Sequence, residues 1–383
     1  MSTCGGHACQ HHAVPDINTS SVIAVDEITP AWLTDALTAA GAVDGAAIIE
    51  IDRTPVGAGQ VGDTYRLALT YDHDDHDGPM PVIAPSSVIV KVSAADPTSR
   101  AAAAMHHLYE REVRFYEVVA PLVGIRTPAC LFSAINLEDN TFILLLEDLT
   151  PVRMADQIGG MTLGDVETAL GDLAKLHAPV WGDASVTGLP WLNYGDETRD
   201  QAVAFSAMLF DTFLERYATE LDELTESVIR RYRDLVGPAL LHEHHSLTVI
   251  HGDYRADNML YDGRDGDVPF VVVDWQTVGS GPGLLDVAYL LGTGLDADTR
   301  AANEERLVRG YLETITVAGV TGYDWDQCWE DYRRYATYGV FMLTTAAVVV
   351  ERTERGDAMF LAMLRRIAAQ VTHLDTASLI TDS

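Results

Sequence analysis

Basic residues are scarce in this chain, and lysine is almost absent. The 383 residues include 25 Lys or Arg against 57 Asp or Glu, which gives a formal net charge of −32. The only lysines are Lys91 and Lys175. A protein this acidic repels nucleic-acid phosphates and anionic lipid heads, so we expect neither nucleic acid nor a membrane surface as a partner. Neutral or cationic small molecules remain compatible with the charge, as does a nucleotide bound together with magnesium.

Cysteine and long apolar runs are scarce as well. The four cysteines lie at irregular spacings: Cys4, Cys9, Cys130 and Cys328. This pattern is not a disulfide framework, and it favours a reducing compartment. No basic N-terminal segment precedes an apolar stretch, and the apolar run at 339–350 is well short of the roughly 20 residues of a membrane span. We therefore expect a soluble, cytoplasmic protein.

Residues 1–22 are polar and lack periodicity, which predicts a flexible N-terminal tail. Several of these residues carry the chemistry of zinc ligands: Cys4, His7, Cys9, His11 and His12. Their spacing matches no standard zinc finger, so a metal site in the tail is the less favoured of the two interpretations.

The sequence up to residue 149 has the pattern of an antiparallel sheet with one helix against it. A short helix is expected over 29–41, because a threonine and a proline open it and a glycine follows it. Strands and a second helix come next. The expected strands cover 46–56, 64–71, 87–93, 129–135 and 142–146, and the helix covers 99–120.

The rest of the chain is mainly helical. Helices are expected over 163–178, 198–217, 220–236, 298–316, 325–350 and 357–372, with a block of strands at 247–251, 259–261 and 270–273. We therefore predict an α+β, two-lobed fold. A small N-lobe, with an antiparallel sheet and one helix, covers 23–149, and a larger, mainly helical C-lobe covers 150–383.

The turn after the first long strand reads GAGQVG at 57–62, a GxGxxG pattern with Gly57, Gly59 and Gly62. A dinucleotide-binding Rossmann unit follows these glycines with a helix, whereas 64–71 alternates like a strand. A glycine-rich hairpin between antiparallel strands lets backbone N–H groups approach a triphosphate. The pattern favours a triphosphate over NAD, with a plain flexible hairpin as the alternative.

Lys91 lies within the apolar strand 87–93. Burying an ammonium without a counter-charge is unfavourable, so this lysine needs a carboxylate partner. Glu112 on the following helix is the expected partner, although Glu110 and Glu117 lie nearby. Such a pair would place a compact cation on the α- and β-phosphates of ATP. The alternative is an edge-strand lysine whose ammonium lies in solvent.

The segment HGDYRADN at 251–258 carries the most specific signal in the chain. Asp253 can receive a hydroxyl proton, and Asn258, five residues later, offers an amide oxygen to a metal. Asp274 follows a buried strand and completes a set of oxygen ligands of the kind that magnesium prefers. Phosphoryl transfer needs mainly positioning and charge neutralisation, and these residues supply both.

In these motifs the chain resembles the protein-kinase-like small-molecule phosphotransferases, which include aminoglycoside phosphotransferases, choline kinases and ecdysteroid-kinase-like proteins. The resemblance covers roughly residues 45–350. The segments that carry it are GAGQVG (57–62), VIVKVS (88–93), YEREVRFY (109–116), LLLEDL (144–149), DLAKLHA (172–178), HGDYRADN (251–258), VVDWQ (272–276) and GLLDVAYLL (283–291).

The resemblance implies a bilobal protein-kinase-like fold and an ATP- and Mg²⁺-dependent transfer of the γ-phosphate to a hydroxyl of a small molecule. Adenine would bind the backbone linker from Glu147 to Leu149. Asp253 would be the catalytic base, and Asn258 and Asp274 would bind magnesium.

By the same resemblance, His251 and Asp286 would support the catalytic loop without contacting substrate. His177 is interpreted as a histidine packed at a helix end.

The alternative function is a nucleotide-binding pseudokinase that acts as a sensor or scaffold. For a kinase, the acceptor could be aminoglycoside-like, an amino-alcohol, a sugar or a steroid-type alcohol. The choice of ATP over GTP and the oligomeric state are left open.

Two departures from protein kinases bear on the substrate. Asp-Trp-Gln at 274–276 replaces Asp-Phe-Gly, so the glycine hinge is missing, and Gln276 favours the ecdysteroid-kinase-like branch. Only 11 residues separate Asp274 from Asp286. An activation loop with its phosphosite does not fit in that length, so we expect no platform for a protein substrate.

Overall fold

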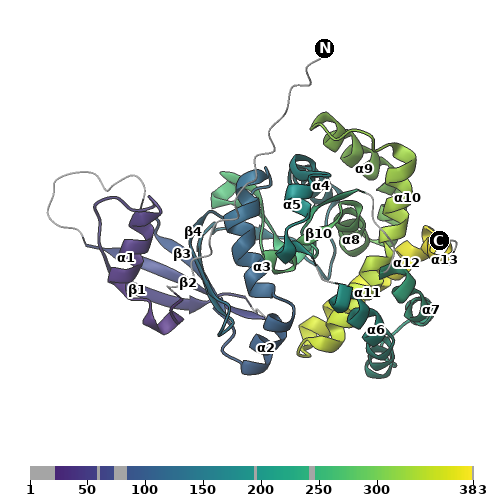
Figure 1. Cartoon of the computed structure of the whole chain (residues 1–383), viewed down its shortest axis with the longest axis horizontal. Coiled ribbons are helices and arrows are strands. Elements are labelled where there is room, and N and C mark those ends of the chain that lie inside the picture. The colour runs from purple at the N-terminus through teal and green to yellow at the C-terminus, as the bar shows by residue number, and fades with distance from the viewer. Residues whose placement is uncertain (1–21, 58–60, 73–83, 194–195, 241–245, 382–383) are drawn as a thin grey trace, which may run out of the picture.

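The structure is a computed structural model that describes residues 22–57, 61–72, 84–193, 196–240 and 246–381 (Figure 1). A sheet-rich part formed by the first third of the chain stands beside a larger helical part (Figure 1). The possible zinc ligands of the N-terminal tail lie outside the described residues, and so does Gly59. No helix within the described ranges is long and apolar enough to cross a bilayer.

A five-stranded antiparallel sheet forms the smaller part and confirms the predicted fold class. Its strands are β1 (Ile48–Pro55), β2 (Gly62–Tyr71), β3 (Ser87–Ser93), β4 (Cys130–Asn136) and β5 (Thr141–Glu147). They lie in the order β1-β2-β3-β5-β4. A strand therefore follows the glycine turn, which contradicts a Rossmann unit. The sheet ends at Glu147, and the division between lobes near residue 149 remains a prediction.

The alternation of β3 decides where its lysine points. Val88, Val90 and Val92 pack into an apolar layer with helix α1 (Pro30–Ala39) on one face of the sheet. Because successive side chains of a strand point to opposite faces, Lys91 points to the other face. That face is covered by the helices between β3 and β4, so the lysine points into the interior rather than into solvent.

The helical segment after β3 is not the single helix expected over 99–120. It consists of α2 (Pro97–Met105), α3 (Leu108–Arg114) and a π-helical stretch at Phe115–Val119. His107 separates α2 from α3 in the left-handed conformation, with a φ of 54°. A left-handed residue cannot continue a right-handed helix, so α3 takes a new direction and packs against the sheet and against residues 275–277.

Helices dominate the larger part. They are α4 (Leu163–His177), α5 (Ala184–Thr187), α6 (Asp196–Arg216), α7 (Glu223–Leu240), α8 (Leu284–Gly294), α9 (Ala297–Val317), α10 (Trp325–Tyr335), α11 (Thr337–Val349), α12 (Glu354–His373) and α13 (Thr376–Thr381). The prediction of one helix over 325–350 is wrong, because a break at Ala336 separates α10 from α11. There the Gly339 N–H bonds to the Ala336 carbonyl, a tighter turn than an α-helix makes.

Two short antiparallel sheets lie next to these helices. One has the order β6 (Arg153–Met154), β8 (Met259–Gly263) and β9 (Val268–Val272), and the other pairs β7 (Leu247–Ile250) with β10 (Gly279–Pro282). β6, β10 and α13 are too short to show a periodic pattern and were not expected. The two sheets hold the loops that follow β7 and β9, and those loops carry the candidate site.

A buried aromatic stack joins the two parts of the molecule. Trp275, in a 3-10 turn after β9, is fully buried and lies parallel to Phe115, with ring centroids 3.7 Å apart. Nearby, the Arg111 guanidinium donates a hydrogen bond of 2.6 Å to the Val278 carbonyl. These contacts fix α3 to the segment that begins at Asp274.

Removing this indole tests how far the two parts depend on one another. Trp275→Ala should lose about 3–5 kcal/mol of stability, because truncating a buried tryptophan leaves a cavity. We expect a lower thermal unfolding midpoint by circular dichroism. Phe205→Ala, at a residue that is 54% exposed, is the matched control and should change the free energy of unfolding by less than about 0.5 kcal/mol. Equal midpoints for both variants would contradict a stabilising role for the stack.

Candidate active site

A single ammonium joins carboxylates from two distant segments. Lys91 Nζ lies 2.6 Å from Glu112 Oε1 on α3 and 3.1 Å from Asp274 Oδ1 after β9. The three side chains are 16%, 2% and 30% exposed, respectively. The structure thus brings Lys91 and Glu112 together, whereas Glu110 pairs with Arg114 and Glu117 accepts from Ser133.

The charges of this cluster shift one another's pKa values. Burial lowers the pKa of Lys91, but the charges of Asp274 and Glu112 outweigh burial and hold this pKa above its ordinary value. Burial raises the pKa of Glu112, and Lys91 offsets only part of that effect. Burial raises the pKa of Asp274, but the ammonium of Lys91 lowers it by more, so this pKa lies below its ordinary value. A protonated lysine and an ionised Asp274 suit contact with phosphates and with a divalent cation.

One buried carboxylate fixes the backbone of the loop after β7. Asp286, fully buried in α8, accepts hydrogen bonds from the N–H groups of His251 at 2.7 Å and Gly252 at 2.9 Å. Gly252 has a φ of +81°, and a Cβ at this position would lie 2.6 Å from the Thr277 carbonyl oxygen. Only glycine fits such a position, so the loop approaches residue 277 more closely than any other residue type permits.

Two histidines complete the support of this loop. His251 Nε2 lies 3.1 Å from the Val273 carbonyl, and its Nδ1 accepts the Asp253 N–H at 3.2 Å, which places the imidazole proton on Nε2. His177 is fully buried at the end of α4, as expected, but it also contacts Asp286, with Nε2 3.3 Å from Oδ2. The sequence alone carried no signal for this contact, because the two residues lie 109 positions apart.

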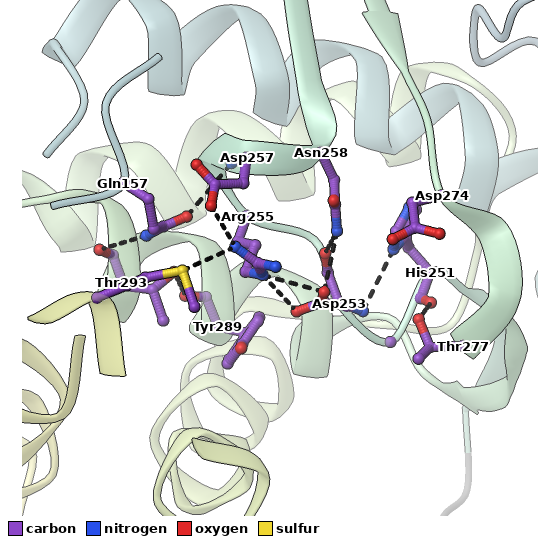
Figure 2. A network of polar contacts seen from close by, with 12 residues as sticks. Gln157, His251, Asp253, Arg255, Asp257, Asn258, Asp274, Thr277, Tyr289 and Thr293 are labelled. Atoms are coloured by element: carbon purple, nitrogen blue, oxygen red, sulfur yellow. Dashed lines mark hydrogen bonds and ion pairs between the residues drawn. The ribbon is translucent and has the colours of Figure 1, made fainter. Parts of the chain in front are cut away.

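Asp253 is held by two neighbours from its own loop (Figure 2). Asn258 Nδ2 donates to the Asp253 carbonyl at 2.8 Å and to Oδ2 at 3.0 Å. Arg255 Nε lies 3.0 Å from both carboxylate oxygens. The spacing of HGDYRADN does not reveal the Arg255 contact, because pairing at i, i+2 depends on the shape of the loop.

Asn258 and Asp274 are the residues that could hold a divalent metal. They flank neighbouring strands β8 and β9, where the Val273 N–H bonds to the Asn258 carbonyl at 3.0 Å. Because Asn258 Nδ2 is used by Asp253, its Oδ1 is the atom left for a ligand bond. An amide oxygen and a carboxylate fit magnesium, which prefers few protein ligands, all of them oxygens. The described part of the chain contains no separate group of three or more His, Cys, Asp or Glu suited to a metal.

The glycine turn and the linker lie at opposite ends of the sheet's strands, since Gly62 pairs with Ser93 at the end of β3 and Glu147 pairs with Val88 near its start. Gly57 has a φ of +75°, and a Cβ on Gly62 would lie 3.1 Å from the Val92 carbonyl oxygen. Tyr109 of α3 anchors the end of the turn, since its hydroxyl donates to the Val61 carbonyl at 2.6 Å. The turn is thus tied to the same helix as Glu112.

Two arginines hold the linker, one from the segment before β4 and one from the turn after β8. Glu147 pairs with Arg126 at 2.6 Å and with Arg264 at 2.8 Å. Arg264, in the turn after β8, also donates its backbone N–H to the buried Leu149 carbonyl at 3.0 Å. The Glu147 side chain therefore serves the shape of the linker, and adenine binding by the backbone there remains a prediction.

A protein-family model and one curated protein match this chain in sequence. A family model described as "Phosphotransferase enzyme family" matches residues 82–328, which is more than half of the chain. An uncharacterized kinase-like protein of Caenorhabditis elegans is 25% identical over 195 residues. That match covers 49% of this chain and 50% of the relative, so the chain spans about half the length of the curated relative that it matches.

Three solved structures show a distant likeness. The gentamicin complex of APH(2″)-IIa is 14% identical with a TM-score of 0.47, covering 90% of this chain and 99% of that one. A choline kinase from Cryptosporidium parvum is 9% identical with a TM-score of 0.45, covering 87% and 90%. A microcompartment-associated aminopropanol kinase is 13% identical with a TM-score of 0.41, covering 88% and 95%. Likenesses this distant say nothing about the substrate of this chain.

Substitutions that leave one charge of the buried cluster without a partner should lower the free energy of unfolding. Lys91→Met leaves the Glu112 carboxylate buried beside Asp274 without a cation. We therefore expect the free energy of unfolding to fall by about 3–5 kcal/mol. Lys91→Met with Glu112→Gln should lose less, because the second change removes the unpaired charge. Chemical denaturation measures both variants.

An ion pair with two exposed partners is the control. Arg230 and Glu226 are 61% and 40% exposed, so Arg230→Met should lose less than about 1 kcal/mol. Glu112→Gln alone completes the cycle, and a double variant as unstable as the sum of the two single changes would show that Lys91 and Glu112 are not coupled.

Proposed function

Because the chain belongs to the phosphotransferase enzyme family, we propose that it is a kinase for small molecules, which transfers the γ-phosphate of ATP to a hydroxyl group. The observation that carries this proposal is the contact between Lys91 and Asp274, which lie 183 residues apart in the sequence. It places a cation from the sheet beside the loops that hold Asp253 and Asn258. Phosphoryl transfer depends mainly on such positioning and on charge neutralisation.

In the proposed reaction, the Asp253 carboxylate accepts the proton of the acceptor hydroxyl while that oxygen attacks the γ-phosphorus. A new O–P bond forms as the bond between the γ-phosphorus and the β,γ-bridging oxygen breaks. ADP leaves with that electron pair, and the proton passes from Asp253 to solvent. Asn258 keeps the carboxylate oriented for this step.

Lys91 is the group that we propose for the α- and β-phosphates. An ammonium has three N–H donors, and the bonds to Glu112 and Asp274 use two of them. The third can point to a phosphate oxygen. Backbone N–H groups of the glycine turn, with Gly57, Gly59 and Gly62, would approach the triphosphate. Magnesium, held by Asn258 and Asp274, would neutralise the charge that develops on the phosphate oxygens.

The segment between Asp274 and Asp286 supports a small acceptor. It consists of the 3-10 turn Trp275–Thr277, then β10, then the start of α8. Every residue of β10 pairs with β7, and Trp275 is fully buried. Because the segment is short and β10 is fully paired, it supports a site without an activation loop of the protein-kinase kind.

Asp253→Asn tests the proposed base. The change removes the proton acceptor but preserves shape, so turnover should fall by about 10²–10⁴, whereas the variant should still fold and bind Mg·ATP. ATP consumption is measured over a panel of aminoglycosides, choline-like amines, sugars, nucleosides and steroid alcohols. Asp265→Asn, in an exposed turn, is the control and should keep full turnover.

Two results would contradict the proposal. Near-wild-type turnover in Asp253→Asn would remove Asp253 from the reaction. Magnesium-dependent nucleotide binding by the wild-type protein without ATP consumption, across the whole panel, would favour the pseudokinase alternative.

A further inference from the structure

We propose that Arg255 is a positioning residue of this reaction, whose guanidinium holds the Asp253 carboxylate in the orientation that receives the acceptor hydroxyl. The inference rests on the proposed function, since it needs Asp253 to be the base. Phosphate binding and metal ligation, as proposed above, make no use of Arg255. The residue therefore has a contact with the base but no assigned part in binding.

The geometry of the contact fixes the plane of the carboxylate. Arg255 Nε lies 3.0 Å from both Asp253 oxygens, and Asn258 Nδ2 holds Oδ2 from a second direction (Figure 2). Rotation of the carboxylate about its Cβ–Cγ bond would break at least one of these bonds. Because Asp253 and Arg255 are only 14% and 17% exposed, solvent weakens the pair less than it weakens a surface ion pair.

Arg255 is itself anchored from behind. Its Nη1 donates to Asp257 Oδ2 at 3.1 Å and lies 3.6 Å from Met359 Sδ. The Asp257 N–H bonds to Gln157 Oε1 at 3.4 Å, and Gln157 Nε2 donates to the Thr293 carbonyl at 3.2 Å. A chain of polar contacts thus runs from α8 through the fully buried Gln157 to the base (Figure 2). These contacts hold the guanidinium in one position, from which it can orient the Asp253 carboxylate.

The chemistry of the side chain explains why an arginine is suited to this place. Burial lowers the pKa of Arg255, but the charges of Asp253 and Asp257 outweigh burial and hold this pKa above its ordinary value. A planar guanidinium presents Nε and Nη1 in a rigid fork and can contact two carboxylates at once. A lysine has one ammonium on a flexible stem, so it would not fix both partners in one geometry.

A double-mutant cycle tests the inference directly. Arg255→Ala should lower kcat about 10²-fold, because a misplaced catalytic group costs that much, while the KM for Mg·ATP stays nearly unchanged. In an Asp253→Asn background, Arg255→Ala should cause no further loss, because Arg255 acts only through Asp253. Turnover is measured with Mg·ATP and the acceptor that the panel identifies, and Mg·ATP affinity and the unfolding midpoint are measured for every variant.

Chemical rescue separates positioning from structure. Added guanidinium should restore part of the turnover of Arg255→Ala, whereas ammonium should not. Arg255→Lys should remain impaired for the same geometric reason. Arg255→Gln, which keeps length and polarity, replaces the alanine variant if that variant does not fold. Arg230→Gln, which breaks an exposed ion pair with Glu226 on α7, is the matched control and should leave kcat unchanged.

The outcomes distinguish this inference from the proposed function. If Asp253→Asn keeps wild-type turnover, the base assignment fails, and the inference fails with it. If Asp253→Asn collapses while Arg255→Ala turns over normally, only the inference is wrong. An equal loss from Arg255→Ala in both backgrounds would also overturn it, because Arg255 would then act independently of Asp253.

Discussion

A buried ammonium between two carboxylates is the interaction on which the arrangement of this molecule depends. Lys91 comes from the sheet, Glu112 from α3, and Asp274 from the loop after β9. Separating them would leave charges unpaired in a poorly solvated place, which is strongly unfavourable. The pairing thus fixes the sheet relative to the helical part, and the parallel stack of Trp275 on Phe115 supports the same alignment with apolar contact.

The loop that carries Asp253 depends on a different kind of support. Asp286 satisfies two backbone N–H groups of the loop, and Tyr338 donates to the Gly252 carbonyl at 2.6 Å. These partners belong to helices, so the loop is held by rigid elements on several sides. This loop requires a glycine at residue 252, where φ is positive and the backbone passes close to residue 277.

Much of the fold could be predicted from the sequence, because local patterns encode it. The apolar strand around Lys91 predicted a carboxylate partner, and the structure brings Glu112 to it. The spacing of HGDYRADN predicted that Asp253 and Asn258 belong to one site, and the two side chains are in contact. The breaks at His107 and Ala336 could not be predicted, since neither residue is a helix breaker by type. Tertiary packing decides both breaks.

The contacts of Arg255 and His177 were missed for a related reason. Each of these side chains finds its partner through the path of the backbone and not through sequence spacing. For Arg255, the loop turns its guanidinium back onto Asp253 two residues earlier. For His177, the partner lies in a helix far along the chain. The sequence shows residue types and their spacing, but it does not show how the backbone folds to bring these two side chains to their partners.

The paired strand β10 has a consequence for how such a protein can be controlled. Residues 279–282 are held by β7, and Trp275 is stacked in the interior, so the segment between Asp274 and Asp286 is fixed by packed contacts at its start and along β10. A covalent switch in this segment would have to disrupt packed structure before it could change the site.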